Sequence, residues 1–323
     1  MTAPPVFLLG RTNLANQILT TSHGTNREAF SPKDWGLFLS VSAIWGSSFL
    51  FMTIGLDAFH PGLVTWLRLG FGAAFIAMLP RARQSKIPRR EWRRIGVLGL
   101  IWLAIPFTIF PIALQWVDSS VTGMLNGATP IFTAVIASIL LWHLPGRFQM
   151  IGLVVGFTGI VAIALPSAGE GSTAALGVVL IVVATICYAF ATNIVAPLQQ
   201  KYGSLPVMAR VQWVAVALVT PYGIYGLTRS EFAWPSLFAM LAVGVLGTGV
   251  ALVLMGSLVG SVGPTRATFV TYVYPVVALA LGVVFRDEVV APIAIAGIPL
   301  VIAGAVIASR SEVAFRPLPA EAL

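Results

Sequence analysis

The segment SSVTGMLNGATPIFTAVIASIL, residues 119–140, has a partner 145 positions further on, PTRATFVTYVYPVVALALGVVF, residues 264–285. Both segments are long and apolar, and Pro130 of the first falls on Pro275 of the second. The same shift aligns further residues without a gap: Pro61 with Pro206, Gly99 with Gly244, Gly152 with Gly297, and Gly159 with Gly304. A repeat of this length indicates that a whole structural unit occurs twice in the chain.

Each unit contains five apolar stretches long enough to cross a bilayer, whose hydrocarbon core of about 30 Å requires roughly 20 helical residues. The chain is 58% hydrophobic and 9% charged, whereas soluble domains are about a quarter charged. Continuous apolar runs exclude a β-barrel, whose strands alternate and are about half as long. We therefore predict an all-α integral membrane protein with ten transmembrane helices, at residues 35–54, 61–79, 95–116, 119–140, 150–165, 175–198, 206–226, 235–258, 264–285 and 292–308.

An odd number of spans in each unit places the two units in the membrane with opposite orientation. Such inverted repeats are typical of carriers that work by alternating access. The predicted organisation is a flexible cytosolic tail, two five-helix repeats and a second cytosolic tail, at residues 1–33, 34–166, 175–310 and 311–323 respectively. Small-residue faces on the fifth and tenth spans favour close helix packing. They leave open whether the protein is a monomer or a homodimer.

The distribution of basic residues predicts how the chain is oriented. The loop Pro80–Arg94 carries seven basic residues and one acid, Glu91. With that loop in the cytosol, both termini are cytosolic too, and fourteen basic residues lie on the cytosolic side against two, Arg229 and Arg286, outside. Basic loops stay on the cytoplasmic side of a membrane. The net charge of +8 is therefore explained by orientation and does not indicate a nucleic-acid partner.

Several short stretches resemble EamA-type members of the drug/metabolite transporter superfamily. They are IWGSSF at 44–49, WLR at 66–68, ALQWVDSS at 113–120, NGATPIFT at 126–133, GPTRA at 263–267, YPVV at 274–277, and Asp287 with Glu288. The resemblance covers about residues 35–310 and implies a ten-helix inner-membrane carrier, often an exporter of amino acids or other small metabolites. One departure is His143, which stands where the family usually has a glutamate between the fourth and fifth spans.

Three prolines within spans are expected to interrupt helices. Proline has no N–H, so the carbonyl four residues earlier loses its hydrogen bond. Pro130, Pro275 and Pro197 free the carbonyls of Asn126, Thr271 and Asn193, respectively. Polar backbone at membrane depth is tolerated where it faces a cavity or buried protein, and matching interruptions in both halves indicate a site at the midplane. The alternative is a kink whose carbonyl is satisfied by a neighbouring Ser or Thr.

Arg68 is the one charged residue close to the middle of a span. Exposing it to lipid there costs about 2.5–3.5 kcal/mol, so it is expected to face the interior. It could hold the carboxylate of a substrate, or it could cap freed helix carbonyls. No Asp, Glu or His lies within the predicted spans to pair with it. The expected substrate-binding residues are Trp45, Ser48, Arg68, Trp102, Asn126, Thr129, Tyr188, Asn193, Thr271 and Tyr272.

These observations predict a secondary transporter, working as an exporter, of small carboxylate-bearing or zwitterionic metabolites in the bacterial inner membrane. No G-x-x-x-x-G-K-[ST] loop is present, and no cluster of His, Cys or acids has metal-ligand spacing. We therefore expect no cofactor, no metal and no catalytic residue. Two alternatives remain, a passive channel and an intramembrane lipid-modifying enzyme, although the latter would need acids or histidines that the spans lack.

The orientation can be tested with reporter fusions. Fusions after Arg94 and after Glu170 are expected to report opposite compartments, with the Arg94 fusion in the cytosol, because the basic loop resists translocation. A periplasmic reporter signal from the Arg94 fusion would overturn the predicted topology.

Overall fold

Every element of the described chain is a helix. The computed structural model describes residues 31–140, 147–169, 171–262, 267 and 269–308, and no strand occurs within these ranges. The first half contains α2 (Pro32–Leu56), α3 (Pro61–Met78), η1 (Pro80–Arg83), η2 (Arg89–Glu91), α4 (Trp92–Leu98), η3 (Gly99–Ala104), α5 (Ile105–Ala113), α6 (Ser119–Asn126), α7 (Thr129–Leu140) and α8 (Arg147–Gly169). The second half contains α9 (Ser172–Tyr202), α10 (Ser204–Leu227), α11 (Trp234–Ala242), η4 (Val243–Val250), α12 (Ala251–Val262), α14 (Val270–Arg286) and α15 (Pro292–Ala308).

Seven helical segments are long and apolar enough to cross a membrane, namely Pro32–Leu56, Pro61–Met78, Arg89–Ala113, Met150–Ser167, Ser172–Tyr202, Ser204–Leu227 and Trp234–Val259. Two shorter apolar helices, Val270–Arg286 and Pro292–Gly304, follow them. The predicted fourth span, 119–140, differs from the expectation of one helix, because it consists of α6 and α7 with a break between them. An all-α membrane protein is confirmed.

The first helix begins inside the predicted N-terminal tail, at Pro32. Ser31 causes this start, because its hydroxyl accepts a hydrogen bond from Asp34 N (3.2 Å) while the Asp34 carboxylate accepts one from Ser31 N (3.0 Å). This reciprocal capping satisfies two backbone donors that the helix itself cannot. The remainder of the two predicted tails, residues 1–30 and 309–323, and His143 lie outside the described residues.

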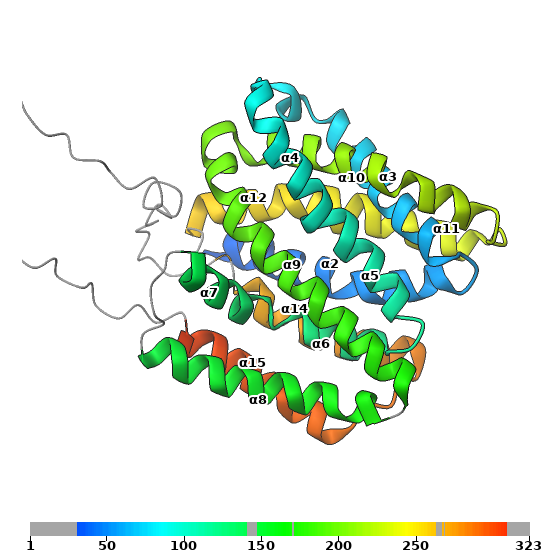
Figure 1. Cartoon of the computed structure of the whole chain (residues 1–323), viewed down its shortest axis with the longest axis vertical. Coiled ribbons are helices and arrows are strands. Elements are labelled where there is room, and N and C mark those ends of the chain that lie inside the picture. Colours follow the sequence, from blue (N-terminus) through cyan, green and yellow to red (C-terminus); the bar gives the residue numbers. More distant parts are fainter. Residues whose placement is uncertain (1–30, 141–146, 170, 263–266, 268, 309–323) are drawn as a thin grey trace, which may run out of the picture.

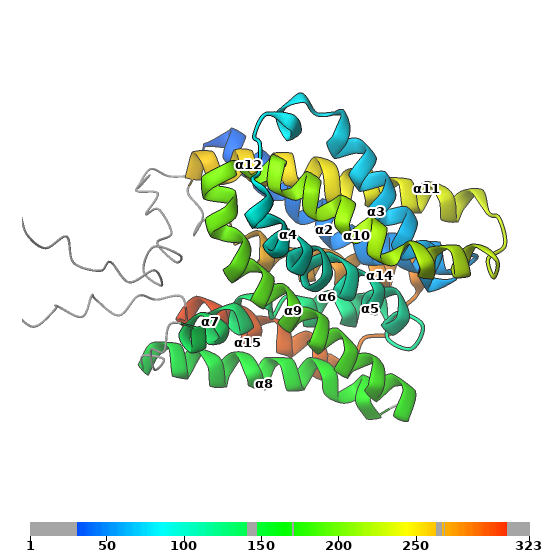
Figure 2. The same ribbon diagram turned by 45° about the horizontal axis from the view of Figure 1, so that its top comes forward.

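The connections between helices alternate between two ends of the bundle (Figure 1, Figure 2). One end, which we call the basic end, holds the Pro80–Arg94 loop, the turn from α9 to α10, the start of α2 and the finish of α15. The opposite end, which we call the far end, holds the turns after α2, α5, α10 and α14. Helical segments joined by one of these turns are therefore antiparallel.

Two short π-helical segments, η3 and η4, occur at corresponding positions of the two halves. The η3 segment begins at Gly99, and its counterpart Gly244 is the second residue of η4. Each glycine allows close contact with a helix of the other half. A Cβ on Gly99 would lie 2.6 Å from Val214 Cγ1 of α10, and one on Gly244 would lie 2.7 Å from Phe71 Cβ of α3. Such π segments are frequent at functional sites because they release backbone carbonyls from the regular ladder.

The glycine faces of α8 and α15 pack against each other within one chain. A Cβ on Gly159 would lie 2.7 Å from Val301 N and 2.8 Å from Gly297 O, so the two backbones are in direct contact. Small residues that permit this approach drive helix association in lipid, where apolar burial alone gives no preference. The glycine faces that could have packed between two chains therefore contact each other within one chain.

The largest apolar core connects the two halves. Its buried members come from most of the helices of both halves and include Phe49, Met52, Phe110, Leu125, Ile181 and Ala278. The candidate site described next lies along this core.

Candidate functional site

Arg68 of α3 is buried with only 7% of its surface exposed. Its Nη1 donates to Met52 Sδ (2.9 Å), and its guanidinium carbon lies 4.0 Å from the centroid of the Phe107 ring. Thioether sulfur is a weak acceptor and an aromatic face attracts cations. Its Nε has no hydrogen-bond partner in the described chain, and no carboxylate of that chain forms an ion pair with it. Arg68 is therefore a buried cation that still has a donor to offer.

Arg68 does not cap a helix in the structure. None of its guanidinium nitrogens donates to a backbone carbonyl of the described residues. Two roles were expected for Arg68, capping helix carbonyls and binding a substrate carboxylate. The geometry favours the second, in which a group from outside the chain accepts a hydrogen bond from Arg68.

An aromatic cluster lies beside Arg68. Phe107 packs edge-on against Tyr188 of α9 (6.3 Å between centroids), and Phe110 stacks on the same tyrosine (5.8 Å). Thr65 Oγ1 donates to Phe107 O (2.9 Å), which ties α5 to α3 at this level. Phe107 thus lies between the buried cation and Tyr188, since it contacts both.

The carbonyl freed by Pro130 is satisfied by a neighbouring threonine, as the alternative expected, and also by a tyrosine from the other half of the chain. Asn126 ends α6, and its carbonyl accepts hydrogen bonds from Thr129 Oγ1 (2.6 Å) and from the Tyr274 hydroxyl (2.8 Å). Asn126 Nδ2 in turn donates to the Tyr274 oxygen (2.9 Å). Tyr274 belongs to α14, so the break in α6–α7 is held by a residue 148 positions away.

The other two prolines do not end their helices. Pro275 lies inside α14 and Pro197 inside α9, and both helices continue through them. A proline removes one hydrogen bond, and a helix packed along its length can tolerate that loss by bending. Asn193 contributes on α9, since its Nδ2 donates to Ala189 O (2.9 Å) and to Thr133 O of α7 (3.3 Å). Of the three prolines, only Pro130 lies at a helix boundary.

Trp45 and Ser48 of α2 are placed against η4. Trp45 Nε1 donates to Gly247 O (3.1 Å), a carbonyl within the π segment. Ser48 Oγ donates to Ile44 O (3.0 Å) and lies 2.9 Å from the position of a Cβ on Gly247. Any side chain larger than glycine at position 247 would displace this hydroxyl.

The remaining expected residues are Trp102, Thr271 and Tyr272. Trp102 is half-buried in η3 and packs on the core formed by α3, α9 and α10. Tyr272 is half-buried and stacks on Phe269 (5.7 Å), while Thr271 lies half-buried in the first turn of α14. The sequence did not single out Phe107 or Tyr274 as site residues. The position of Tyr274 directly before the repeated proline was the available signal.

Two buried oxygens near η4 also lack partners. Gln212 Oε1 and Thr248 Oγ1 make no hydrogen bond with the described residues, although Gln212 Nε2 donates to Leu69 O (3.2 Å). A Cβ on Gly72 would lie 2.7 Å from Gln212 Nε2 and 3.0 Å from Thr248 Cβ, so these groups border the same space between α3, α10 and η4.

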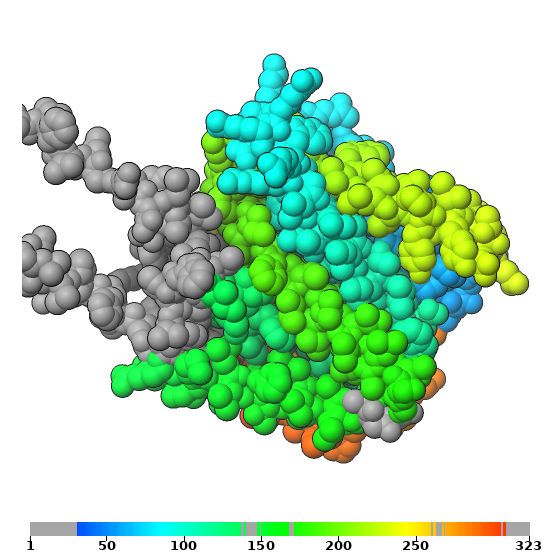
Figure 3. Space-filling view, viewed as in Figure 1, coloured from blue at the N-terminus to red at the C-terminus, as the bar shows by residue number. Residues whose placement is uncertain are grey.

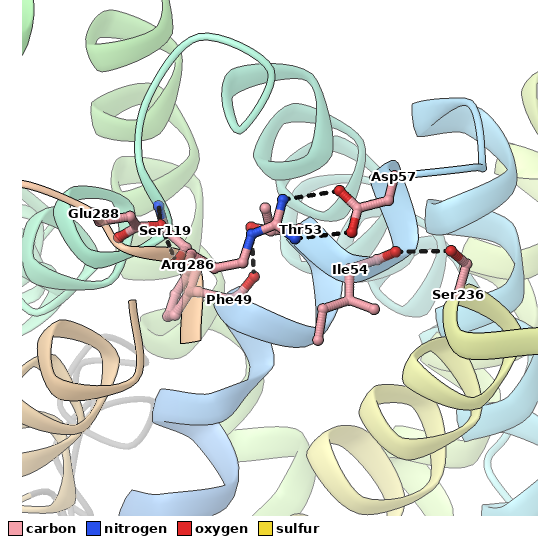
Figure 4. A network of polar contacts seen from close by, with 8 residues as sticks. All are labelled: Phe49, Thr53, Ile54, Asp57, Ser119, Ser236, Arg286 and Glu288. Carbon is pink, nitrogen blue, oxygen red and sulfur yellow. Dashed lines mark hydrogen bonds and ion pairs between the residues drawn. The ribbon is translucent and has the colours of Figure 1, made fainter. Parts of the chain in front are cut away.

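Charged contacts join several helices at the far end, as Figure 4 shows. Asp57, after α2, accepts two hydrogen bonds from Arg286 at the end of α14, each 2.8 Å long. Glu288 accepts from Ser119 N (2.9 Å), Ser119 Oγ (2.6 Å) and Ser120 N (2.9 Å), and so caps α6. A carboxylate is stabilised at a helix N-terminus. We call this set of contacts the far-end latch.

His60 lies at the same end and caps α3. Its Nδ1 accepts a hydrogen bond from Gly62 N (3.1 Å), which requires the neutral imidazole. Burial and then the positive charge of Arg229 lower the pKa of His60 below its ordinary value. The cap is therefore maintained at neutral pH.

A helical bundle with an interrupted helix, π segments and a buried unpaired cation defines the class of membrane transporters. The sequence profile of the EamA-like transporter family matches residues 35–165 and, separately, residues 175–310. The chain belongs to the EamA-like transporter family.

Similar proteins are transporters by name. The chain is 27% identical over 294 residues to the Escherichia coli K12 inner membrane transporter YedA, covering 88% of this chain and 93% of YedA. It is 26% identical over 285 residues to a Streptantibioticus cattleyicolor protein named "Probable terminal-alkyne amino-acid exporter", covering 85% and 93%. A solved structure aligns with a TM-score of 0.56 at 18% identity, over 85% of this chain and 96% of the other, and supports the fold alone.

Replacing Tyr274 with phenylalanine is expected to destabilise the protein by about 1–3 kcal/mol, because Asn126 loses a donor and an acceptor in a partly buried position. Tyr272→Phe is the matched control, since the Tyr272 ring stacks on Phe269 and no hydrogen bond of its hydroxyl is recorded. Equilibrium unfolding in detergent micelles measures both. Equal stability of the two variants would contradict a structural role of the Tyr274 hydroxyl.

Proposed function

We propose that this protein is a secondary transporter that exports small carboxylate-bearing or zwitterionic metabolites across the bacterial inner membrane by alternating access. In this proposal ten transmembrane helices form two inverted five-helix repeats, and both termini are cytosolic. The observation that carries the substrate class is Arg68, a buried cation with an unpartnered nitrogen and no carboxylate partner among the described residues. A carboxylate solute would supply the missing acceptor.

Three features support the two repeats. The family profile matches the chain twice, in segments that correspond to the proposed units. The π segments η3 and η4 begin about 145 residues apart, the same offset as the sequence repeat. The principal helix pairs also follow the repeat, because α3 packs on α10 and α8 on α15, each with its own counterpart. In this arrangement α6 and α7 together form one interrupted crossing.

The electrostatics around Arg68 support an anionic group on the solute. A buried cation without a counter-ion is costly, and an incoming carboxylate can accept charge-assisted hydrogen bonds from a guanidinium in a bidentate manner. Phe107 and Tyr188 provide apolar surface next to that charge. An amino-acid exporter among the relatives is consistent with a zwitterionic solute.

The contacts at the far end support a carrier closed on that side. The Asp57–Arg286 pair and Glu288 hold α2, α6 and α14 together. In an alternating-access cycle these contacts would separate when the far end opens. A passive channel has no need of such a closure.

Arg68 can be tested by transport measurements in proteoliposomes with a panel of labelled amino acids. Arg68→Ala is expected to weaken carboxylate transport per folded molecule by roughly 10- to 100-fold, the loss expected from a charge-assisted hydrogen bond of about 1.5–3 kcal/mol. Arg68→Lys keeps the charge and should retain part of the activity.

Arg210→Ala is the matched control for Arg68. Arg210 donates to Pro206 O (2.8 Å) and Ser85 O (2.8 Å), so its loss should lower the amount of folded protein without changing transport per molecule. If Arg68→Ala behaves in this same way, its role is structural and the proposed substrate class is wrong.

The coupling mechanism can be tested in the same vesicles. Because no Asp, Glu or His lies within the ten predicted spans, protons have no relay across the midplane. We expect saturable counterflow of a labelled solute and no uphill accumulation when a pH gradient is imposed alone. Accumulation that survives Cys187→Ala would show that an acid at a helix end couples transport to protons. Flux without counterflow would indicate a channel.

A further inference from the structure

The loop Pro80–Arg94 presents a dense and almost unopposed positive charge. Every basic side chain of the loop is exposed, and the seven are Arg81, Arg83, Lys86, Arg89, Arg90, Arg93 and Arg94. The single acid, Glu91, is 8% exposed, and its carboxylate lies 3.4 Å from Arg94 Nη1, 3.8 Å from Arg90 Nε and 3.5 Å from the Tyr202 hydroxyl. The other five cations of the loop have no acid partner among the described residues. We call residues 80–94 the basic platform.

The basic platform is held in a defined conformation. It contains the two short helices η1 and η2, and Ala82 and Ile87 anchor it with 1% and 8% exposure. Arg210 of α10 reaches under it and donates to Ser85 O (2.8 Å), while Arg83 Nη2 donates to Ala77 O (2.8 Å). The backbone that carries these charges is therefore ordered, so binding an anion requires little ordering of the main chain.

The position of the basic platform matches the depth of lipid headgroups. It joins the ends of α3 and α4, and the apolar side chains that flank it are exposed: Met78 (77%), Trp92 (47%) and Val97 (47%). Tryptophan is enriched at the boundary between hydrocarbon and headgroups. In the space-filling view the platform, in cyan, projects from the basic end beside these helices (Figure 3).

We propose that the basic platform is a binding surface for anionic phospholipids, whose phosphodiester groups are held by its arginines. Six of its seven cations are arginines, whose planar forks bind phosphate oxygens in pairs. The opposite end of the bundle offers no such surface in the described residues, since Arg286 there is paired with Asp57 and Arg229 lies over the Tyr225 ring. The platform alone combines charge density, order and headgroup depth.

The test uses the purified full-length protein and counts bound phosphatidylglycerol, against phosphatidylcholine, by native mass spectrometry during a lipid titration. The variant R81Q/R89Q/R93Q removes three exposed charges for which no side-chain contact is recorded. The matched control K33Q/R147Q/K201Q removes three exposed charges from the same end but outside the platform. Each basic side chain in contact with an anionic headgroup strengthens binding roughly fivefold. The platform variant is therefore expected to bind phosphatidylglycerol at least about tenfold more weakly, and the control to bind like the parent.

Equal weakening in both variants, or equal binding of the two lipids by the parent, would overturn the proposal. Nucleic acid that copurifies with the parent but not with the platform variant, without a preference for phosphatidylglycerol, would assign the surface to another partner and also overturn it. Unfolding temperatures show whether the variants fold. If the triple variant fails to fold, the single variants R81Q and R89Q provide the test. Each is expected to bind phosphatidylglycerol roughly fivefold more weakly than the parent. None of these results depends on the solute transported.

Discussion

The fold depends on one constraint, that backbone groups in hydrocarbon must find partners within the protein. The carbonyl of Asn126 shows how the chain meets it. Pro130 removes the helical partner of this carbonyl, and the Tyr274 hydroxyl from α14 replaces it at 2.8 Å. Thr129 Oγ1 also donates to this carbonyl (2.6 Å), so a local donor and a distant donor share it. The Tyr274 bond couples the local break in one helix to the packing of α6 against α14.

The sequence alone predicts the helical segments, their approximate bounds and the types of residue within them. These depend on the length of apolar runs and the positions of prolines, which are local properties of the chain. It could not distinguish Pro130 from Pro197 and Pro275, since all three delete the same hydrogen bond. Their outcomes differ because α9 and α14 continue through their prolines. Pairings such as Asn126 with Tyr274 and Asp57 with Arg286 are separated by 148 and 229 positions, and only the folded chain brings them together.

Arg68 was recognised from its charge and depth alone, but its surroundings required the structure. The sequence left open whether it caps a helix. In the structure its guanidinium contacts the sulfur of Met52 and the ring of Phe107, and its Nε has no partner among the described residues. Family membership and the names of relatives then establish a membrane transporter.

The far-end latch has no equivalent in the other half of the repeat. The offset of 145 carries Asp57 to Tyr202, and counting back from Arg286 and Glu288 gives Leu141 and His143, none of which can reproduce the ion pair or the carboxylate cap. Duplication has preserved the backbone pattern and not the charges. The charged contacts of the far end therefore have no counterpart of the same chemistry at the aligned positions of the sequence. The Asp57–Arg286 pair is also partly exposed, with 49% and 31% of the two side chains accessible, so dissolved ions on that side of the molecule can weaken it.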